Sequence, residues 1–223
     1  MQATTGDTSL TTMRWLAFLS LAGIVCYIAI DVLLFFLRPD LPILHRAESD
    51  YGNGPWAWIM DVNFLLRCAL SLAAVFAFWQ VLPRTLITRL ALGLLTVWAI
   101  ASGILAFFPD DYEGAAPTTH GKIHLLAAVI AFLCCLLATL LLTGVLACHW
   151  RGLFIVAALA ASWLIAAAGL FLLFRAGFTL HALAGLYERL FLGFELLWIA
   201  LAMIQLIWGR KPVSPATGLP APV

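Results

Sequence analysis

Charged residues are scarce in this chain. Lys, Arg, Asp and Glu together supply only 10% of its 223 residues, while hydrophobic residues supply 64%. Such a composition excludes an ordinary soluble domain and is typical of a membrane protein. The sequence also lacks a phosphate-binding glycine loop and a Gly-x-Ser-x-Gly nucleophile motif, and it shows no sign of nucleic-acid binding. We therefore expect no nucleotide-binding domain, no serine-hydrolase elbow and no nucleic-acid partner.

The five cysteines give no sign of a disulfide framework or a thiolate metal site. They form no Cys-x-x-Cys pair and no Cys/His spacing typical of zinc ligands. All of them fall inside apolar runs or at the end of one, where a free thiol behaves as a small hydrophobic group. The five are Cys26, Cys68, Cys134, Cys135 and Cys148.

Long apolar runs fill most of the sequence. A membrane-spanning helix needs about 20 mainly apolar residues, and the chain offers six such runs with short polar breaks between them. They lie at about 15–37, 56–82, 86–108, 123–148, 153–174 and 187–208. We predict an all-α fold, a bundle of six transmembrane helices with short loops, set in a lipid bilayer. The bundle would occupy residues 14–209, between disordered tails at 1–13 and 210–223.

The charged residues predict an orientation in the membrane and indicate which face holds the functional residues. Six spans place both termini on the same side of the membrane. Six of the twelve Lys and Arg residues fall on that side and five on the other, with Arg67 inside a span. By the positive-inside rule this narrow excess predicts cytoplasmic termini. Of the eleven Asp and Glu residues only Asp7 lies on the terminal side. Acids do not set orientation, but they indicate that the chemistry lies at the opposite face.

The densest cluster of titratable residues lies between two apolar runs, in the stretch 107–124. Its members are Asp110, Asp111, Glu113, His120 and His124. Pro109 ends the preceding helix, because its ring cannot continue the hydrogen-bond ladder. Thr118 or Thr119 can cap the next helix through its side-chain oxygen. On that helix His120 and His124 are four residues apart and share one face.

Four charged residues lie inside predicted spans: Asp31 in the first, Asp61 and Arg67 in the second, and Glu195 in the sixth. Each costs roughly 2.5–3.5 kcal/mol near the bilayer centre, so such residues usually pair or line a water-filled path. From about 1.5 Å of rise per residue, Asp31 and Asp61 lie roughly 8–9 Å deep, and Arg67 and Glu195 roughly 15 Å deep. We predict a shallow layer of acids and histidines with an Arg67–Glu195 ion pair as its floor.

Three further features belong to this picture. His181, Glu188 and Glu195 are spaced by seven and share one helix face. Tyr27 lies one turn from Asp31 and can hydrogen-bond into the same layer. The external loop at 38–55 is longer than most connections, which is typical of a lid or binding loop; the alternative is a solvated connector, with Trp56 and Trp58 as interfacial anchors.

The third and fifth spans carry no charge. Their small residues, Ala99, Ser102 and Gly103 in one and 166–169 in the other, predict close helix packing.

Every one of these residues also has a purely structural interpretation. Asp31 and Asp61 lie within two turns of the surface, where they can reach the interface or cap helix ends. His120 and His124 can bond to loop carbonyl groups at the interface. An Arg67–Glu195 pair can serve only to fix the register of two helices.

The same residues resemble a known family. The chain is similar to bacterial membrane proteins grouped as domain of unknown function 998. The similarity rests on Asp31, the Asp50-Tyr51-Gly52 loop, Asp61, the Phe-Pro-Asp-Asp run at 108–111, the His-Gly-Lys-Ile-His run at 120–124, and Glu188-Arg189 with Glu195. The resemblance covers almost the whole chain. It implies six helices and a place in the bacterial cytoplasmic membrane, but no activity.

A second resemblance is to intramembrane hydrolases of the alkaline-ceramidase and adiponectin-receptor type. It rests on the His-x-x-x-His pair at 120 and 124, with His181 and Asp31 or Asp61 as further zinc ligands. The order differs, because here the His-x-x-x-His pair opens the fourth helix and the chain has six spans rather than seven.

These observations favour an outward-facing pocket that binds or transports a small polar solute or lipid headgroup. The predicted pocket and relay residues are Asp31, Asp61, Arg67, His120, His124, Glu188 and Glu195. One alternative is a zinc hydrolase with His120, His124 and His181 as ligands and Glu188 as general base. Two others are a haem held by His124 and another histidine, and a scaffold or accessory subunit whose charges only fix packing.

Overall fold

The computed structural model describes residues 5–112, 115–150, 152–176 and 183–209. In these residues the chain forms six α-helices and one short 3-10 helix, with no β-strand. They are α1 (Thr5–Leu37), η1 (Glu48–Gly52), α2 (Ala57–Val81), α3 (Leu86–Leu105), α4 (Thr119–His149), α5 (Leu153–Ala176) and α6 (Ala184–Trp208). All six α-helices are long and apolar enough to cross a membrane. The predicted all-α, six-span architecture is confirmed.

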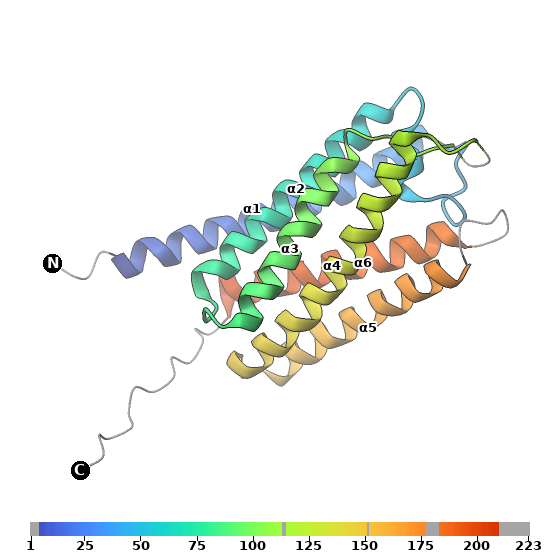
Figure 1. Cartoon of the computed structure of the whole chain (residues 1–223). Coiled ribbons are helices and arrows are strands. Elements are labelled where there is room, and N and C mark those ends of the chain that lie inside the picture. The colour runs from blue at the N-terminus through green and yellow to red at the C-terminus, as the bar shows by residue number, and fades with distance from the viewer. Residues whose placement is uncertain (1–4, 113–114, 151, 177–182, 210–223) are drawn as a thin grey trace, which may run out of the picture.

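The helices form one bundle in which each packs on its neighbours in sequence and α1 also packs on α6 (Figure 1). The seam between α4 and α5 is the least closely packed of these contacts. We call the end where α1, α3 and α5 finish and α2, α4 and α6 begin the polar end. Helix α1 begins and helix α6 ends at the opposite end of the bundle (Figure 1).

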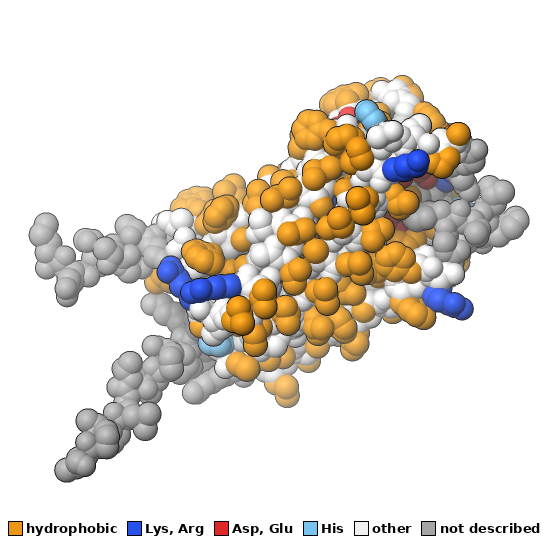
Figure 2. Space-filling model, viewed as in Figure 1, with side chains coloured by type: hydrophobic (Ala, Val, Ile, Leu, Met, Phe, Trp, Pro, Cys, Tyr) orange, Lys and Arg blue, Asp and Glu red, His pale blue; other side chains and the backbone are white. Residues whose placement is uncertain are grey.

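Large apolar side chains cover the outside of the bundle (Figure 2). Every helix leaves some of them exposed, for example Val25 on α1, Phe76 on α2, Leu126 on α4 and Phe154 on α5. A helix that is apolar on all sides belongs inside a large core or in a bilayer. Because these side chains lie on the surface of the bundle, they fit a lipid environment.

The helix ends at the polar end follow from local sequence. Pro39 lies two residues after the end of α1, where a proline cannot continue a helix. Thr118 caps α4, since its Oγ1 accepts a hydrogen bond of 3.0 Å from Gly121 N, and this confirms one of the two predicted caps. Helix α3 ends at Leu105, three residues before the predicted end of that span. The residues between α3 and Pro109 form a tight turn, which leaves the Phe108 carbonyl free for a side chain.

The predicted tail at 1–13 is wrong for residues 5–13, because α1 already begins at Thr5. Met13 is buried in the core, and Leu10 packs against it. Extending a helix that has already formed adds one hydrogen bond per residue, so a contact of this kind is enough to carry α1 further. The tail at 210–223 and residues 1–4 lie outside the described residues.

Small residues on α3 and α5 make close helix contacts, as predicted. A Cβ at Gly103 would lie 3.3 Å from Cys68 Sγ on α2, and a Cβ at Gly169 would lie 2.8 Å from Phe191 N on α6. The buried indole of Trp98 donates a 2.9 Å hydrogen bond to Ser71 Oγ, which satisfies its only polar atom.

Candidate functional site

The loop between α1 and α2 folds down onto the polar end of the bundle. Its 3-10 helix η1 buries Glu48, Ser49 and Tyr51. Arg38 holds the loop together, because it donates hydrogen bonds of 2.7 and 2.9 Å to the carboxylate of Asp40 and another to the carbonyl of Asn53. These bonds raise the pKa of Arg38 and lower that of Asp40. The loop is therefore an ordered cover rather than a loose connector.

Gly185 at the start of α6 lets this loop come close. A Cβ there would collide with the carbonyl oxygens of Ile43 and Arg46. The same two carbonyls accept hydrogen bonds of 2.9 and 2.8 Å from Arg189 Nη1, and Leu186 N donates 3.0 Å to Leu44 O. Glycine is needed here because the loop backbone occupies the space of a side chain.

Glu48 brings the loop into contact with the buried polar groups of the bundle. Its side chain accepts a hydrogen bond from the hydroxyl of Tyr27, and its backbone N–H donates 2.7 Å to Glu188 Oε2 on α6. The Tyr27 hydroxyl also accepts 3.0 Å from Arg67 Nη1 on α2, and Arg67 Nε donates 3.2 Å to Ser102 Oγ on α3. We call Tyr27, Glu48, Arg67 and Glu188 the floor cluster. Its hydrogen bonds link the loop to four helices.

A second group, the rim cluster, consists of Ser49, Asp110 and His124. Ser49 Oγ donates 2.9 Å to Asp110 Oδ2, and the same oxygen lies 3.9 Å from His124 Nε2. His124 Nδ1 is 2.7 Å from the Phe108 carbonyl, which can only accept, so Nδ1 carries a proton. The serine hydroxyl bonds to the carboxylate rather than to the imidazole. Ser49 and His124 therefore do not form a direct serine–histidine pair, and the Asp110 carboxylate lies between them.

Asp111 fixes the start of α4 beside the rim cluster. Its two carboxylate oxygens accept hydrogen bonds of 2.6 Å from Thr118 Oγ1 and 2.9 Å from Thr118 N, and these lower the pKa of Asp111. A Cβ at Gly121 would collide with this carboxylate. Asp111, which lines the cavity, is thereby held against the first turn of α4.

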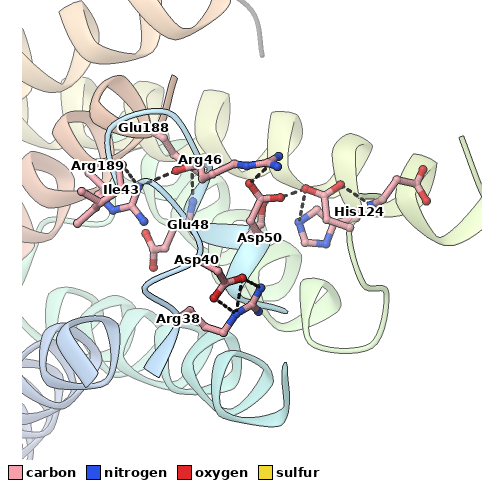
Figure 3. A network of polar contacts seen from close by, with 12 residues as sticks. Arg38, Asp40, Ile43, Arg46, Glu48, Asp50, His124, Glu188 and Arg189 are labelled. Atoms are coloured by element: carbon pink, nitrogen blue, oxygen red, sulfur yellow. Dashed lines mark hydrogen bonds and ion pairs between the residues drawn. The ribbon is translucent and has the colours of Figure 1, made fainter. Parts of the chain in front are cut away.

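The two clusters border a cavity of about 570 Å³. Figure 3 shows the loop that covers it, between Glu188 and Arg189 of α6 on one side and His124 of α4 on the other. The polar lining includes Arg46, Glu48, Asp50, Arg67, Asp110, Asp111, Lys122, His124 and Glu188. The apolar lining includes Phe64, Leu105, Leu125, Ala128, Val129, Phe132, Leu173 and Phe174. The cavity thus has charged groups beside an apolar wall, within the size range of about 300–1,000 Å³ that suits small ligands.

Comparison with known proteins gives a family for this arrangement. A family model described as "Protein of unknown function (DUF998)" matches residues 20–205. The chain belongs to this family. No curated protein and no solved structure matches it. The DUF998 match runs from α1 to α6 and includes every residue of the floor and rim clusters. The family description names no activity, so the chemistry has to be argued from the site.

Among the predicted residues of this DUF998 protein, the structure brings Arg67, His124 and Glu188 to the cavity. Asp31 lies beside the floor cluster and interacts electrostatically with Glu48, and its Oδ1 is buried without a hydrogen-bond partner among the described residues. Tyr27 bonds into this layer, as predicted.

The other predicted residues lie elsewhere. Asp61 is half-buried on α2 and does not line the cavity. His120 is exposed, with its ring 5.5 Å from that of Phe108. Glu195 is fully buried on α6, outside the cavity lining. The depth estimate and the shared helix face therefore grouped residues that point in different directions.

The predicted Arg67–Glu195 ion pair is wrong. The guanidinium of Arg67 lies 5.0 Å from the ring centre of Trp98 and 5.2 Å from that of Phe64, in addition to its bonds to Tyr27 and Ser102. Glu195 instead accepts from two side chains of α4, Thr139 at 3.3 Å and Cys135 at 3.5 Å. Aromatic faces and hydroxyl groups satisfy the arginine, so it needs no carboxylate.

The zinc hypothesis finds little geometry to support it. The described residues contain no group of three or more His, Cys, Asp or Glu side chains that could hold a metal ion. His120 and His124 share a helix face but differ in surroundings, one exposed and one buried. The third predicted ligand, His181, lies outside the described residues.

Sequence reasoning missed Glu48 and Ser49 as site residues. Both lie in the 38–55 loop, whose unusual length predicted a binding loop without indicating which side chains would turn inward. The signal available was a short acidic run directly before Tyr51, in a loop that follows a buried tyrosine and aspartate on α1. Nothing in the sequence fixes which of Glu48 and Asp50 points into the bundle.

Proposed function

We propose that this DUF998 protein binds a small polar solute or a lipid headgroup in the cavity at its polar end, and carries or presents it there. In this proposal the termini are cytoplasmic and the polar end faces outward from a bacterial cytoplasmic membrane. The observation that supports it is the convergence of charged side chains on one cavity. They come from two loops and from α2, α4 and α6.

The location of Arg67 and Glu188 supports a functional site more than a purely structural one. Both are nearly fully buried within membrane-spanning helices, at 2% and 5% exposure. An ionisable residue in a membrane is costly, and it usually marks a path or site for a polar group. Buried ion pairs are also no better for stability than well-packed apolar residues. A ligand or water in the cavity gives these residues a reason to be there.

The loop provides a physical link between occupancy and access. Glu48 lines the cavity and at the same time ties the loop to Tyr27 and Glu188. Ser49 ties it to Asp110 at the rim. A ligand that competes for any of these hydrogen bonds changes how tightly the loop is held. This arrangement suits a binding or transport protein, in which the cover has to respond to the ligand.

Native mass spectrometry of the full-length protein in native lipid nanodiscs tests the proposal. We expect the wild type to retain a bound small molecule or lipid, and Glu188→Gln to lower its occupancy at least about tenfold, the effect of about 1.4 kcal/mol. Asp61→Asn is the matched control, since it neutralises another acid near the polar end that does not line the cavity. We expect it to retain the ligand. An empty wild-type cavity, or equal retention by both variants, would favour a scaffold role instead.

A further inference from the structure

One wall of the cavity is apolar, and a purely polar solute would make no favourable contact with it. We infer that its ligand is a membrane amphiphile with an amine-bearing headgroup, whose hydrocarbon chain leaves the bundle between α4 and α5. This inference rests on the proposed function and specifies the class of ligand. It is carried by three features of the structure: the seam between two helices, the way into the cavity, and the charge of the lining.

The seam between α4 and α5 is open to lipid beside the cavity. Leu125 of α4 and Phe174 of α5 both line the cavity, yet they are 57% and 54% exposed. Val129, one turn further along α4, and Leu173, next to Phe174 on α5, continue the same apolar wall. Among the helices that are neighbours in sequence, α4 and α5 make the least extensive contact. The cavity therefore reaches the lipid-facing surface along an apolar strip.

The opposite approach, from water, is covered by the loop. Its backbone is hydrogen-bonded to Arg189 and Leu186 of α6, and Glu48 is buried beneath it. A solute that entered beneath this loop would have to break these contacts. An amphiphile can slide its headgroup in from the bilayer while its chain stays among apolar groups throughout. Lateral entry thus avoids exposing the chain to water and leaves the loop in place.

The charges of the lining favour a positively charged headgroup. Five carboxylates line the cavity against three Lys or Arg side chains, Arg46, Arg67 and Lys122, and two histidines. Arg46 lies 4.0 Å from Asp50, and Arg67 is surrounded by aromatic rings and hydroxyl groups. Glu48 and Glu188 are both buried, and the Glu188 carboxylate accepts a hydrogen bond from the backbone N–H of Glu48. Placing an ammonium group near both carboxylates offsets their mutual repulsion.

The test measures binding of three probes to the purified full-length protein in detergent by native mass spectrometry. Lysophosphatidylethanolamine has both an amine headgroup and a chain. Lysophosphatidylglycerol has the chain without the amine, and phosphoethanolamine has the amine without the chain. We expect the first to bind at least about tenfold more tightly than either of the others.

Variants of the seam and the floor separate the two parts of the inference. Val129→Trp fills the apolar strip and should weaken binding of lysophosphatidylethanolamine about tenfold. If the tryptophan variant does not fold, Val129→Phe takes its place, and we expect it to weaken binding to a smaller extent. Leu126→Trp is the matched control, because Leu126 is 61% exposed on α4 and does not line the cavity. Glu188→Gln should remove the preference for the amine over the glycerol headgroup.

Three results would overturn the inference. In the first, phosphoethanolamine binds as tightly as lysophosphatidylethanolamine, and Val129→Trp does not weaken binding. The cavity would then bind a polar solute, so the amphiphile would be rejected while the proposed function would stand. Equal binding of the two lysolipids would reject the amine headgroup. Failure of all three probes, from a protein whose cavity also carries no native ligand, would reject the proposed function together with the inference.

Discussion

A methyl group at position 185 should release the loop that covers the cavity. The new Cβ would occupy the space of the Ile43 and Arg46 carbonyl oxygens, which accept hydrogen bonds from Arg189. Displacing them loses two charge-assisted hydrogen bonds and one backbone bond, together about 4 kcal/mol at the low end of their usual strength. Replacing a helical glycine by alanine returns about 0.5–1 kcal/mol. The net loss of about 3 kcal/mol corresponds to more than about a 100-fold rise in loop opening.

Hydrogen–deuterium exchange of peptides spanning 43–53 measures this opening directly. Gly193→Ala is the control on the same helix, because a Cβ at Gly193 would meet no heavy atom within 4 Å. It makes the same change in helix propensity without touching the loop. We expect fast exchange of the loop peptides in Gly185→Ala alone. Equal exchange in the two variants would show that the loop is not held by its close approach to α6, and the reasoning would fail.

The remaining predictions concern the two clusters and the cap of α4. Tyr27→Phe removes the hydroxyl that joins α1 to α2 and to the loop, so the free energy of unfolding in detergent should fall by about 1–3 kcal/mol. An unchanged thermal midpoint would show that the hydrogen bonds of the floor cluster do not stabilise the bundle. His124→Ala should lower the unfolding free energy by a similar amount and His120→Ala by less than about 0.5 kcal/mol, whereas loss of bound zinc from both variants would support the metal hypothesis. The Asp111 carboxyl should titrate below its ordinary pKa of 3.8 in a ¹³C NMR experiment, and Thr118→Val should raise its midpoint. Its support of the α4 cap is present at neutral pH and is lost as the pH falls through that lowered pKa.

The sequence predicted the number of spans and most of their ends, because these depend on local properties. Run length and apolar composition determine whether a helix can cross a bilayer. Thr118 shows how a single side chain sets a helix start through one hydrogen bond to a nearby backbone N–H. The start of α1 was the exception. There a tertiary contact of Met13 with the core extends the helix through a polar segment that local composition assigns to a tail.

The predicted acid and histidine layer was only partly brought together, and the reason is geometric. Counting residues along a span gives depth, since each residue adds about 1.5 Å along the axis. It does not give the direction of a side chain relative to the other helices. Arg67 and Glu195 were expected to pair from depth alone, but they bond to different helices. Asp61 likewise shares the predicted depth of Asp31 without lining the cavity.

Depth along a span does not determine in which direction a side chain points. Small residues at helix contacts help to set that direction, because they fix how the helices pack. Gly169 brings α5 against the backbone of α6 at Phe191, and Gly103 brings α3 against Cys68 of α2. Such contacts fix how each helix is rotated, and the rotation decides which polar residues face inward. Between α4 and α5 the indole of Trp163 donates a 2.9 Å hydrogen bond to the Leu136 carbonyl, and Val129 lines the cavity about two turns nearer the polar end. A bulky side chain at Val129 therefore tests whether the chain of the ligand passes between α4 and α5, because these two helices make less extensive contact than α2 with α3 or α5 with α6.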